Sequence, residues 1–148
     1  MKWPNDIYHE DRKVAGLLIE NELAGERVVR SVMGVGLNVN QMQFVSDAPN
    51  PVSLRQIVGK PIDREAVLQE FLKNMNDLLG QIGEGRYAEI HSCYLARLFR
   101  MGEGHLYADA AGRFRATITG VEPSGHLLLI DDEGQRRRDA FKEITYII

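Results

Sequence analysis

The chain has 148 residues, which is enough for one ordinary domain or for a small domain with an appendage. Its hydrophobic fraction of 44% and charged fraction of 26% are those of a globular protein and exclude the disordered and fibrous classes. A net charge of −3 gives no general attraction for nucleic acid, so a nucleic-acid partner is not expected.

Cysteine usage and hydropathy limit where the protein works. No apolar stretch approaches the ~18 residues that a membrane span needs, and the N-terminus has no apolar signal core. The single cysteine, Cys93, cannot form an internal disulfide, which suits a reducing compartment. Four scattered histidines show no metal-ligand spacing: His9, His91, His105 and His126. We expect a cytoplasmic protein with neither a membrane partner nor a structural metal site.

Residues 5–40 have the pattern of three strands joined by short turns, the first of them at 9–12. The middle run, 13–23, is apolar at almost every position through Leu18 and Ile19, which is typical of an interior strand covered on each face. Because the turns are short, the pattern predicts an antiparallel meander.

Residues 41–100 have a helical pattern. Ser53 with Gln56 predicts a capping box before a short helix that Gly59 ends, and Asp63 caps a longer one. The apolar residues of the longer helix recur at helical spacing: Val67, Leu68, Phe71, Leu72, Met75, Leu78 and Leu79. Three glycines are expected to end it: Gly80, Gly83 and Gly85. A third helix carries its apolar residues on one face: Tyr87, Ile90, Tyr94 and Leu98.

Residues 104–148 return to strands, separated by tight turns at 109–112, 122–125 and 131–134. Alternation in the second run places Ala116 and Ile118 on one face. Five short strands in this length predict a small curled barrel of the SH3 type.

The segment KWPND, residues 2–6, is the first that could carry chemistry. Pro4 keeps Trp3 out of helical geometry, and Asn5 tolerates a tight turn. The polar ends of Lys2 and Asn5 then lie near the start of a strand, where a phosphate or a metal-bound phosphate could be held. An ordinary turn accounts for the same residues.

Lys13 stands between a polar turn and an apolar strand. An ammonium at the entrance of a dry strand attracts a carboxylate or phosphate strongly, because its surroundings screen it poorly. It can also neutralise negative charge that develops in a transition state. Gly16 removes a side chain where a ligand might press on the backbone. A solvated lysine after a hairpin is the alternative.

The run GVGLNVN, residues 34–40, places Gly34 and Gly36 on one face of a strand, and Asn38 returns to that face. It is not a dinucleotide-binding loop, because no helix follows and the glycine spacing differs. The glycines are explained equally well by a strand that lacks side chains at these positions so that the sheet can pack closely. The basic run 136–138 we expect to be a solvated face paired with Asp131, Asp132 and Glu133 across its hairpin, not a nucleic-acid patch.

Taken in order, three motifs resemble those of the biotin protein ligases: KWPND at 2–6, RKVAGLLIE at 12–20 and GVGLNVN at 34–40. That family carries K-W-P-N-D, R-K-x-x-G-I/L-L-x-E and G-x-G-I/L-N-x-N at about these separations. The resemblance covers essentially the whole chain and implies an α+β fold. Residues 1–100 would form part of a class II aminoacyl-tRNA-synthetase-like mixed or antiparallel sheet with helices, and residues 101–148 a small SH3-like β-barrel.

The resemblance implies a two-step reaction. Biotin and MgATP give biotinyl-5′-adenylate and pyrophosphate, and the biotinyl group then passes to a lysine of the biotin carboxyl carrier protein of acetyl-CoA carboxylase. Lys13 would be the catalytic residue. Four residues would bind biotin and the adenylate: Lys13, Gly16, Gly34 and Gly36. Three would bind the nucleotide or its magnesium: Lys2, Asn5 and Asn38.

One motif of the family, the G-R-G-R-x-G loop, has no counterpart here, because GEGR at 83–86 and GEG at 102–104 stand in a different context. The resemblance therefore implies the C-terminal half of a ligase. We expect the chain to be poorly stable alone, to self-associate as a dimer, or to need the missing N-terminal half. The alternative function is a non-catalytic module that acts in dimerisation or acceptor docking.

Overall fold

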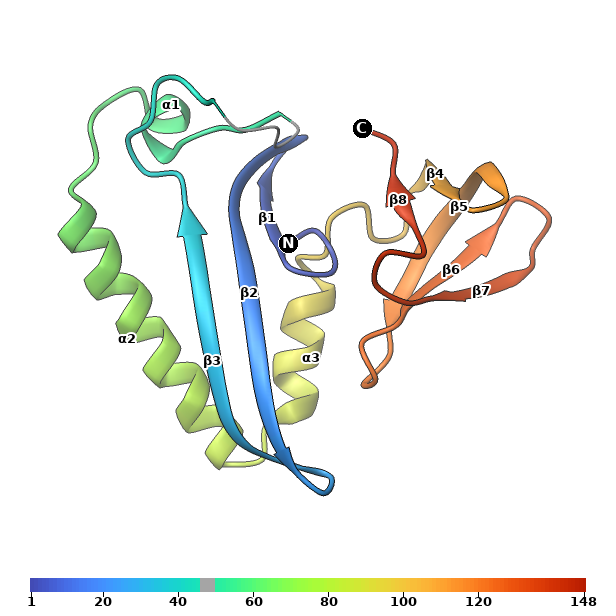
Figure 1. The fold of residues 1–148 in the computed structure, drawn as a ribbon, viewed down its shortest axis with the longest axis horizontal. Helices are drawn as coiled ribbons and strands as arrows, with labels where there is room; N and C mark the ends of the chain where they lie inside the picture. The colour runs from blue at the N-terminus through green and yellow to red at the C-terminus, as the bar shows by residue number, and fades with distance from the viewer. Residues whose placement is uncertain (46–49) are drawn as a thin grey trace. The chain divides into compact units, whose positions relative to one another are not determined.

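The computed structural model describes residues 1–45 and 50–148 and divides the chain into two compact units. The N-terminal unit comprises Lys2 and Pro4–Leu79, and the C-terminal unit comprises Met1, Trp3 and Gly80–Ile148. The predicted domain boundary after residue 100 stays a prediction. The elements follow in the order β1 (Asp6–His9), β2 (Arg12–Ala24), β3 (Arg27–Leu37), α1 (Leu54–Val58), α2 (Arg64–Gly83), α3 (Tyr87–Leu95), β4 (Gly104–Asp109), β5 (Gly112–Val121), β6 (Leu127–Asp131), β7 (Arg136–Asp139) and β8 (Thr145–Tyr146) (Figure 1).

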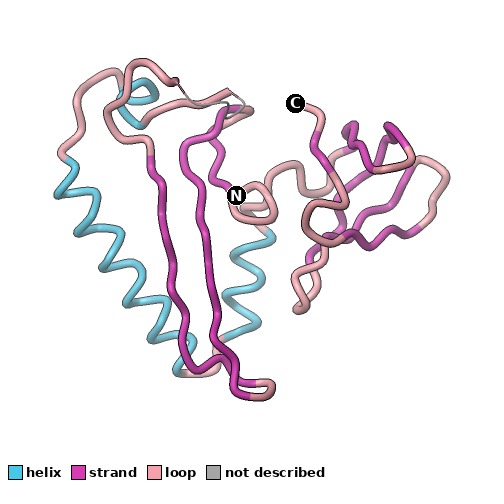
Figure 2. The backbone as a smooth tube through the Cα atoms, viewed as in Figure 1, coloured by secondary structure: helices cyan, strands magenta, loops and turns pink. Residues whose placement is uncertain are grey.

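Strand β2 is the central strand of the sheet in the N-terminal unit. The strand order is β1-β2-β3 and both pairings are antiparallel, which confirms the predicted meander. Strands β2 and β3 form a long hairpin that extends beyond the short strand β1 (Figure 2). The turn between them contains Gly25 with φ +63°, a left-handed conformation that glycine adopts at little cost.

Much of this sheet is not covered within the described residues, although an interior strand was predicted. Leu18, Ile19 and Leu23 of β2 are 64%, 52% and 62% exposed. Strand β3 likewise exposes a set of valines: Val28, Val29, Val32 and Val35. Within the described residues, β2 buries Val14 and Ala15 near its start, but beyond them it is interior only in its hydrogen bonding.

The short helix α1 has the predicted caps. The hydroxyl of Ser53 accepts a hydrogen bond from the amide of Gln56, and the Gln56 side chain accepts one from the amide of Ser53. Gly59 ends the helix in the left-handed conformation, and its amide donates to the carbonyl of Arg55.

Helix α2 ends at one of the three glycines that were expected to end it. Gly80 lies inside the helix, since a glycine in a helix interior costs only about 1 kcal/mol, and the helix ends at Gly83. The chain turns at Gly85, where φ is +76°. Most of its apolar stripe is exposed: Leu68, Phe71, Leu72, Leu78, Leu79 and Ile82. In the described part of the chain, no helix is both long enough and apolar enough to span a membrane.

The C-terminal unit contains all the predicted strands, in an antiparallel sheet of order β7-β6-β5-β4-β8. Alternation along β5 is as predicted, with Ala116 and Ile118 buried on one face. The mixture of helices and antiparallel sheet confirms the α+β class, while closure into an SH3-type barrel stays a prediction.

Apolar side chains on one face of this sheet form a continuous core. Ile118 and Leu127 are fully buried, and Tyr107 packs against Tyr146 edge to face with ring centroids 5.2 Å apart. Trp3 joins this core at 4% exposure, and its indole nitrogen donates to the carbonyl of Gly125 over 2.8 Å.

Helix α3 supplies less of this core than its predicted stripe. Tyr94 and Leu95 pack against the core, but Tyr87 is 64% exposed. Leu98, predicted on the helix, lies just beyond its end and is buried.

Candidate functional site

A bulge in β2 sets the direction of the Lys13 side chain. Strand β1 pairs Asp6 with Gly16 but Tyr8 with Lys13, so the pairing skips Val14. Residues three apart in a regular strand point to opposite faces. The extra residue cancels that alternation and brings the Lys13 side chain over Gly16.

Lys13 is held there by an ion pair with Asp6. Its Nζ lies 2.6 Å from the Asp6 Oδ1, and the two side chains are 26% and 18% exposed. The pair is therefore partly shielded from water, unlike the solvated lysine that was the alternative. A Cβ added at Gly16 would lie 3.3 Å from both the Lys13 Nζ and the Asp6 Oδ1, so any side chain at this position would crowd the pair.

Asp6 is the residue of this site to which the sequence analysis gave no role. It is the last residue of the KWPND segment. Only its position in the hairpin, and not its residue type, could have pointed to a role. Once the first two strands are read as a hairpin, an acidic residue at the start of β1 falls opposite Gly16 on β2. That register brings it within reach of the lysine at the start of the same strand.

The three glycines of the motifs lie on the same face as Lys13. Gly16 pairs directly with Gly36, and Leu18 pairs with Gly34. A Cβ at Gly36 would lie 3.8 Å from the Gly16 carbonyl, and one at Gly34 would lie 3.9 Å from the Leu18 carbonyl. These are ordinary contact distances, so sheet packing alone does not require glycine at 34 or 36. The glycines instead leave bare backbone next to the ammonium.

The two asparagines of the predicted site bind the backbone around it. The Asn5 side chain donates to the Leu17 carbonyl over 2.5 Å and joins β1 to β2. The Asn38 side chain donates to the carbonyls of Lys13, at 3.5 Å, and Val52, at 3.3 Å. Each amide group uses its nitrogen for the scaffold, so its orientation is fixed.

A segment beside β2 completes the surroundings of Lys13. The Lys13 amide donates to the carbonyl of Asn50, and the Val52 amide donates to the carbonyl of Lys13, both over 2.9 Å. Val52 and Ser53 are completely buried. The backbone of Lys13 is therefore anchored on this side as well as on the β1 side.

Lys2 lies at the start of the turn that precedes β1. Its backbone exchanges hydrogen bonds with Asp6, from Lys2 to Asp6 at 2.8 Å and back at 3.0 Å. Its Nζ lies 5.3 Å from the centroid of the Tyr8 ring, within cation–π range. The structure thus places Lys2, Asn5, Asp6 and Lys13 around the ends of β1 and β2.

This arrangement suits the binding of an anion beside a flat ligand. An ammonium has three N–H donors, and Asp6 accepts from it, which leaves further donors for a carboxylate or phosphate oxygen. The bare backbone at Gly16 and Gly36 admits atoms that a side chain would exclude. Among residues 1–45 and 50–148, no group of three or more His, Cys, Asp or Glu is placed to hold a metal ion.

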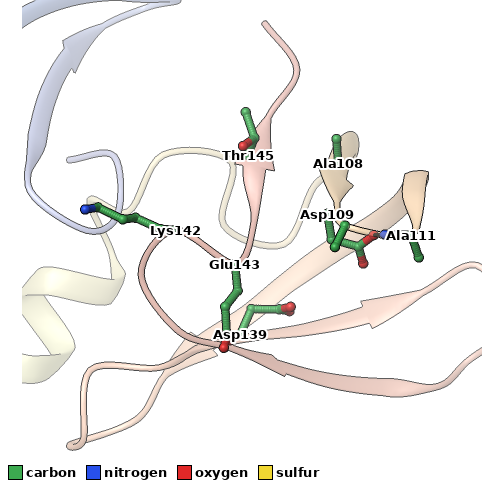
Figure 3. Close-up of a pocket in the computed structure, with 8 residues that line it drawn as sticks. Ala108, Asp109, Ala111, Asp139, Lys142, Glu143 and Thr145 are labelled. Atoms are coloured by element: carbon green, nitrogen blue, oxygen red, sulfur yellow. Dashed lines mark hydrogen bonds between the residues drawn. The ribbon is translucent and has the colours of Figure 1, made fainter.

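A separate hollow of about 670 Å³ lies in the C-terminal unit (Figure 3). Its acidic residues serve local structure. Asp109 accepts hydrogen bonds from the amides of Ala111 and Gly112, and Glu143 accepts one from the amide of Ala140. Hydrogen bonding to Arg137 lowers the pKa of Asp109, with the backbone bonds adding to the effect. These bonds close the β4–β5 turn and the loop before β8.

The basic run 136–138 does not pair as predicted. Arg137 forms ion pairs with Asp109 and Asp139, and Arg138 forms one with Glu122. The predicted partner Asp131 instead accepts hydrogen bonds from the amides of residues 133 and 135 and closes its own turn.

Comparison with known proteins bears on the N-terminal motifs first. Residues 1–38 match the model of the biotin/lipoate A/B protein ligase family. The chain is 29% identical over 142 residues to the bifunctional ligase/repressor BirA of Bacillus subtilis, and 28% identical over 140 residues to the biotin–[acetyl-CoA-carboxylase] ligase of Paracoccus denitrificans. Its fold matches a biotin protein ligase from Aquifex aeolicus with a TM-score of 0.74, 27% identity and 98% of this chain covered. The chain is thus similar to biotin protein ligases in both sequence and fold.

The match to these ligases extends over part of their length. The chain spans 43% of the Bacillus protein, 58% of the Paracoccus ligase and 63% of the Aquifex structure. A further Aquifex structure with the same TM-score of 0.74, at 26% identity, is a complex with biotin and ATP. The roles of individual residues in this chain stay predictions.

Proposed function

We propose that this chain contributes the lysine-bearing part of an ATP-dependent biotin protein ligase site. In the first step a carboxylate oxygen of biotin attacks the α-phosphorus of ATP. The bond from that phosphorus to the bridging oxygen breaks, and pyrophosphate leaves biotinyl-5′-adenylate behind. The biotin carboxylate and the α-phosphate are both anions and repel each other. An ammonium placed between them lowers the activation barrier of this step.

Lys13 would bind the biotin carboxylate and the α-phosphate. Its position supports this role, because the ammonium is fixed by Asp6 at 2.6 Å and lies over Gly16. Asp6 acts as a positioning residue that leaves other ammonium donors for substrate. Gly16, Gly34 and Gly36 give the adenylate access to the backbone. This placement of a held lysine beside bare strand backbone is the observation that carries the proposal.

Lys2, Asn5 and Asn38 would hold the nucleotide phosphates and their magnesium. Magnesium binds oxygen ligands and usually keeps several waters and phosphate oxygens in its shell. Asn5 and Asn38 fit this requirement, since their nitrogens bond the scaffold and each retains an amide oxygen. The ion would supply charge neutralisation of the phosphates.

In the second step the amine of an acceptor lysine attacks the biotinyl carbonyl carbon. An amide bond forms, the amine loses a proton to solvent, and AMP leaves. The acceptor we propose is the biotin carboxyl carrier protein of acetyl-CoA carboxylase. The name of the Paracoccus relative, a ligase for acetyl-CoA carboxylase, supports this choice.

Biotin-dependent exchange of labelled pyrophosphate into ATP tests the first step directly. The purified chain is expected to exchange, and Lys13→Ala is expected to lose about 100-fold or more of that rate. Lys60→Ala removes an exposed lysine near α1 and serves as the matched control with unchanged exchange. Circular dichroism must show the same folded content in all three proteins. Equal exchange in the Lys13 variant would contradict the assignment.

A second function is favoured by the exposed apolar strands: a non-catalytic module of ligase descent that acts in dimerisation or acceptor docking. Leu18, Ile19 and Val35 are apolar surface that a partner would cover. A folded chain without exchange that sediments as a dimer would support this function over catalysis. Ile19→Asp should then shift the chain toward monomer.

A further inference from the structure

Charge is sorted by position in the C-terminal sheet. Arginines stand on the strands, with Arg113 and Arg115 on β5 and residues 136–138 on β7. Acidic residues gather at the turns and strand ends: Asp109, Glu122, Asp131, Asp132 and Glu133. Basic and acidic residues are nearly equal in number over residues 104–148, so the sheet separates the two charges by position.

The arginine run on β7 is divided between two faces. Arg137 points to the core side, where its Cζ lies 3.7 Å from the centroid of the Phe114 ring and its guanidinium pairs with Asp109. Because strand residues alternate, Arg136 and Arg138 point the other way. The middle arginine is structural, and its two neighbours are directed outward.

The strand register shows which residues share the outward face. Arg136 pairs with Ile130, which pairs with Thr117, and Arg138 pairs with Leu128. On the next strand Leu106 pairs with Arg115. We call this surface the arginine face; it consists of Leu106, Arg115, Leu128, Ile130, Arg136 and Arg138.

The arginine face has a groove and, among the described residues, arginines that form no ion pair. The groove has a volume of about 440 Å³, and its lining includes Leu128, Ile130 and Arg136. Arg138 is neutralised by Glu122, with its Nε 2.8 Å from the carboxylate. In the described part of the chain, neither Arg115 nor Arg136 has a carboxylate within the 4.0 Å of an ion pair.

We infer that the arginine face docks an acidic, leucine-containing surface of a partner protein. Two uncompensated guanidinium groups beside exposed Leu106 and Ile130 match carboxylates interleaved with apolar side chains. Arginine is enriched at such interfaces because its planar fork binds carboxylates and its stem covers apolar area. Nucleic acid fits less well, since apolar side chains separate the arginines and Glu122 lies in the groove.

Fluorescence anisotropy of labelled peptides on the full chain tests this inference. The probes are ELEELEEL, the same peptide with every leucine replaced by serine, and a twelve-nucleotide thymidine strand. The leucine peptide should bind about fivefold more tightly than the serine peptide, because only the former fills the groove. Arg136→Glu should weaken leucine-peptide binding about tenfold or more, and 300 mM salt should weaken it relative to 50 mM.

Two variants separate docking from general charge attraction. Arg27→Glu makes the same charge change at an exposed arginine of β3 and should change binding less than twofold. Ile130→Ser should abolish the preference for leucine over serine. Equal weakening by Arg27→Glu and Arg136→Glu would overturn the inference. Equal affinity of the wild-type chain for the two peptides, or tighter binding of the thymidine strand, would do the same.

Discussion

The two units bury their apolar side chains to very different extents. In the C-terminal unit a continuous core includes Tyr107, Ile118 and Leu127, each with 0% exposure. Among the described residues of the N-terminal unit, the buried hydrophobic side chains are Val14, Ala15 and Val52.

The difference means that different interactions offset the loss of conformational entropy on folding in the two units. Burial of apolar area offsets that cost in the C-terminal unit. The N-terminal unit depends more on strand pairing, caps and polar contacts, and it is the unit that carries Lys13 and its glycines. The site therefore belongs to the part of the chain with the most apolar surface still to cover.

The largest expected effect comes from a matched pair of isoleucines. Ile118→Ala should lower the free energy of unfolding of the C-terminal unit by about 2–5 kcal/mol, because it opens a cavity in a buried core. Ile19→Ala, at a position 52% exposed, should cost less than about 1 kcal/mol. Urea unfolding followed by fluorescence reports on the C-terminal unit, since the single tryptophan, Trp3, lies in its core.

Far-ultraviolet circular dichroism should follow the Ile19 variant, whose strand lies outside that core. Losses of similar size in the two variants would show that the N-terminal sheet is packed as tightly as the C-terminal core.

Alkaline pH should destabilise the C-terminal unit through Tyr107. Burial raises the pKa of Tyr107 to about 12, from about 10 when unfolded, and among the described residues its hydroxyl has no hydrogen-bond partner. The folded state favours the neutral phenol, so this stability is complete below pH 10 and is lost as pH rises toward 12. The loss should reach about 3 kcal/mol above that pH.

Tyr107→Phe provides the check on this alkaline effect. Phenylalanine keeps the ring and removes the ionisable group, so the variant should be as stable as the wild type at pH 7 and less sensitive above pH 10. Unfolding midpoints at several pH values, with tyrosinate absorbance at 295 nm, measure both. Burial also raises the pKa of Tyr146, so some alkaline sensitivity should persist.

A cap in the N-terminal unit should have a smaller effect. Ser53→Ala removes the hydroxyl that accepts the Gln56 amide and should destabilise α1 by about 1 kcal/mol. Faster hydrogen exchange in residues 54–58, with no change in the C-terminal strands, is the expected result. Ser31→Ala, on exposed β3, is the control and should leave exchange in α1 unchanged. A change that spread into the C-terminal strands would break the contrast between the units.

The smallest expected stability effect is at the ion pair of the candidate site. Asp6→Asn should lower the free energy of unfolding by less than about 1 kcal/mol, because the pair is only partly buried. Pyrophosphate exchange should nevertheless fall about tenfold, since Lys13 loses its positioning partner. Asp11→Asn removes a carboxylate from the same β1–β2 hairpin and should leave the exchange rate unaltered. A large stability loss with unchanged exchange would make Asp6 a structural residue.

Much of the fold follows from local patterns in the sequence. Glycine-containing turns, the Ser53 capping box and the alternation along β5 each depend on neighbouring residues and were predicted correctly. The end of α2 was predicted to within its three glycines, since the helix passes through Gly80 and ends at Gly83. The coverage of β2 was mispredicted. Apolar residues on both faces of a strand favour burial, but they do not show that other elements of the chain cover those faces.

The sequence suggested which residues to consider for the site, but not the contacts among them. The motifs identified Lys13, Gly16 and Gly36, which the register then places on one face. The ion pair between Lys13 and Asp6 depends on the bulge, and no residue type in the sequence predicts that bulge. Use of the Asn38 nitrogen to bind backbone carbonyls likewise depends on a neighbouring segment that comes later in the chain.

The skipped pairing at Val14 decides on which face of the sheet the Lys13 ammonium lies. If the bulge were straightened with both intervening residues kept, strict alternation over three positions would turn the lysine to the opposite face of the sheet. Every residue assigned to the site would still be in the sequence, yet the ammonium and the bare backbone would no longer meet. The bulge is thus what keeps the lysine and the glycine on one face, and the two residues between them, Val14 and Ala15, are buried.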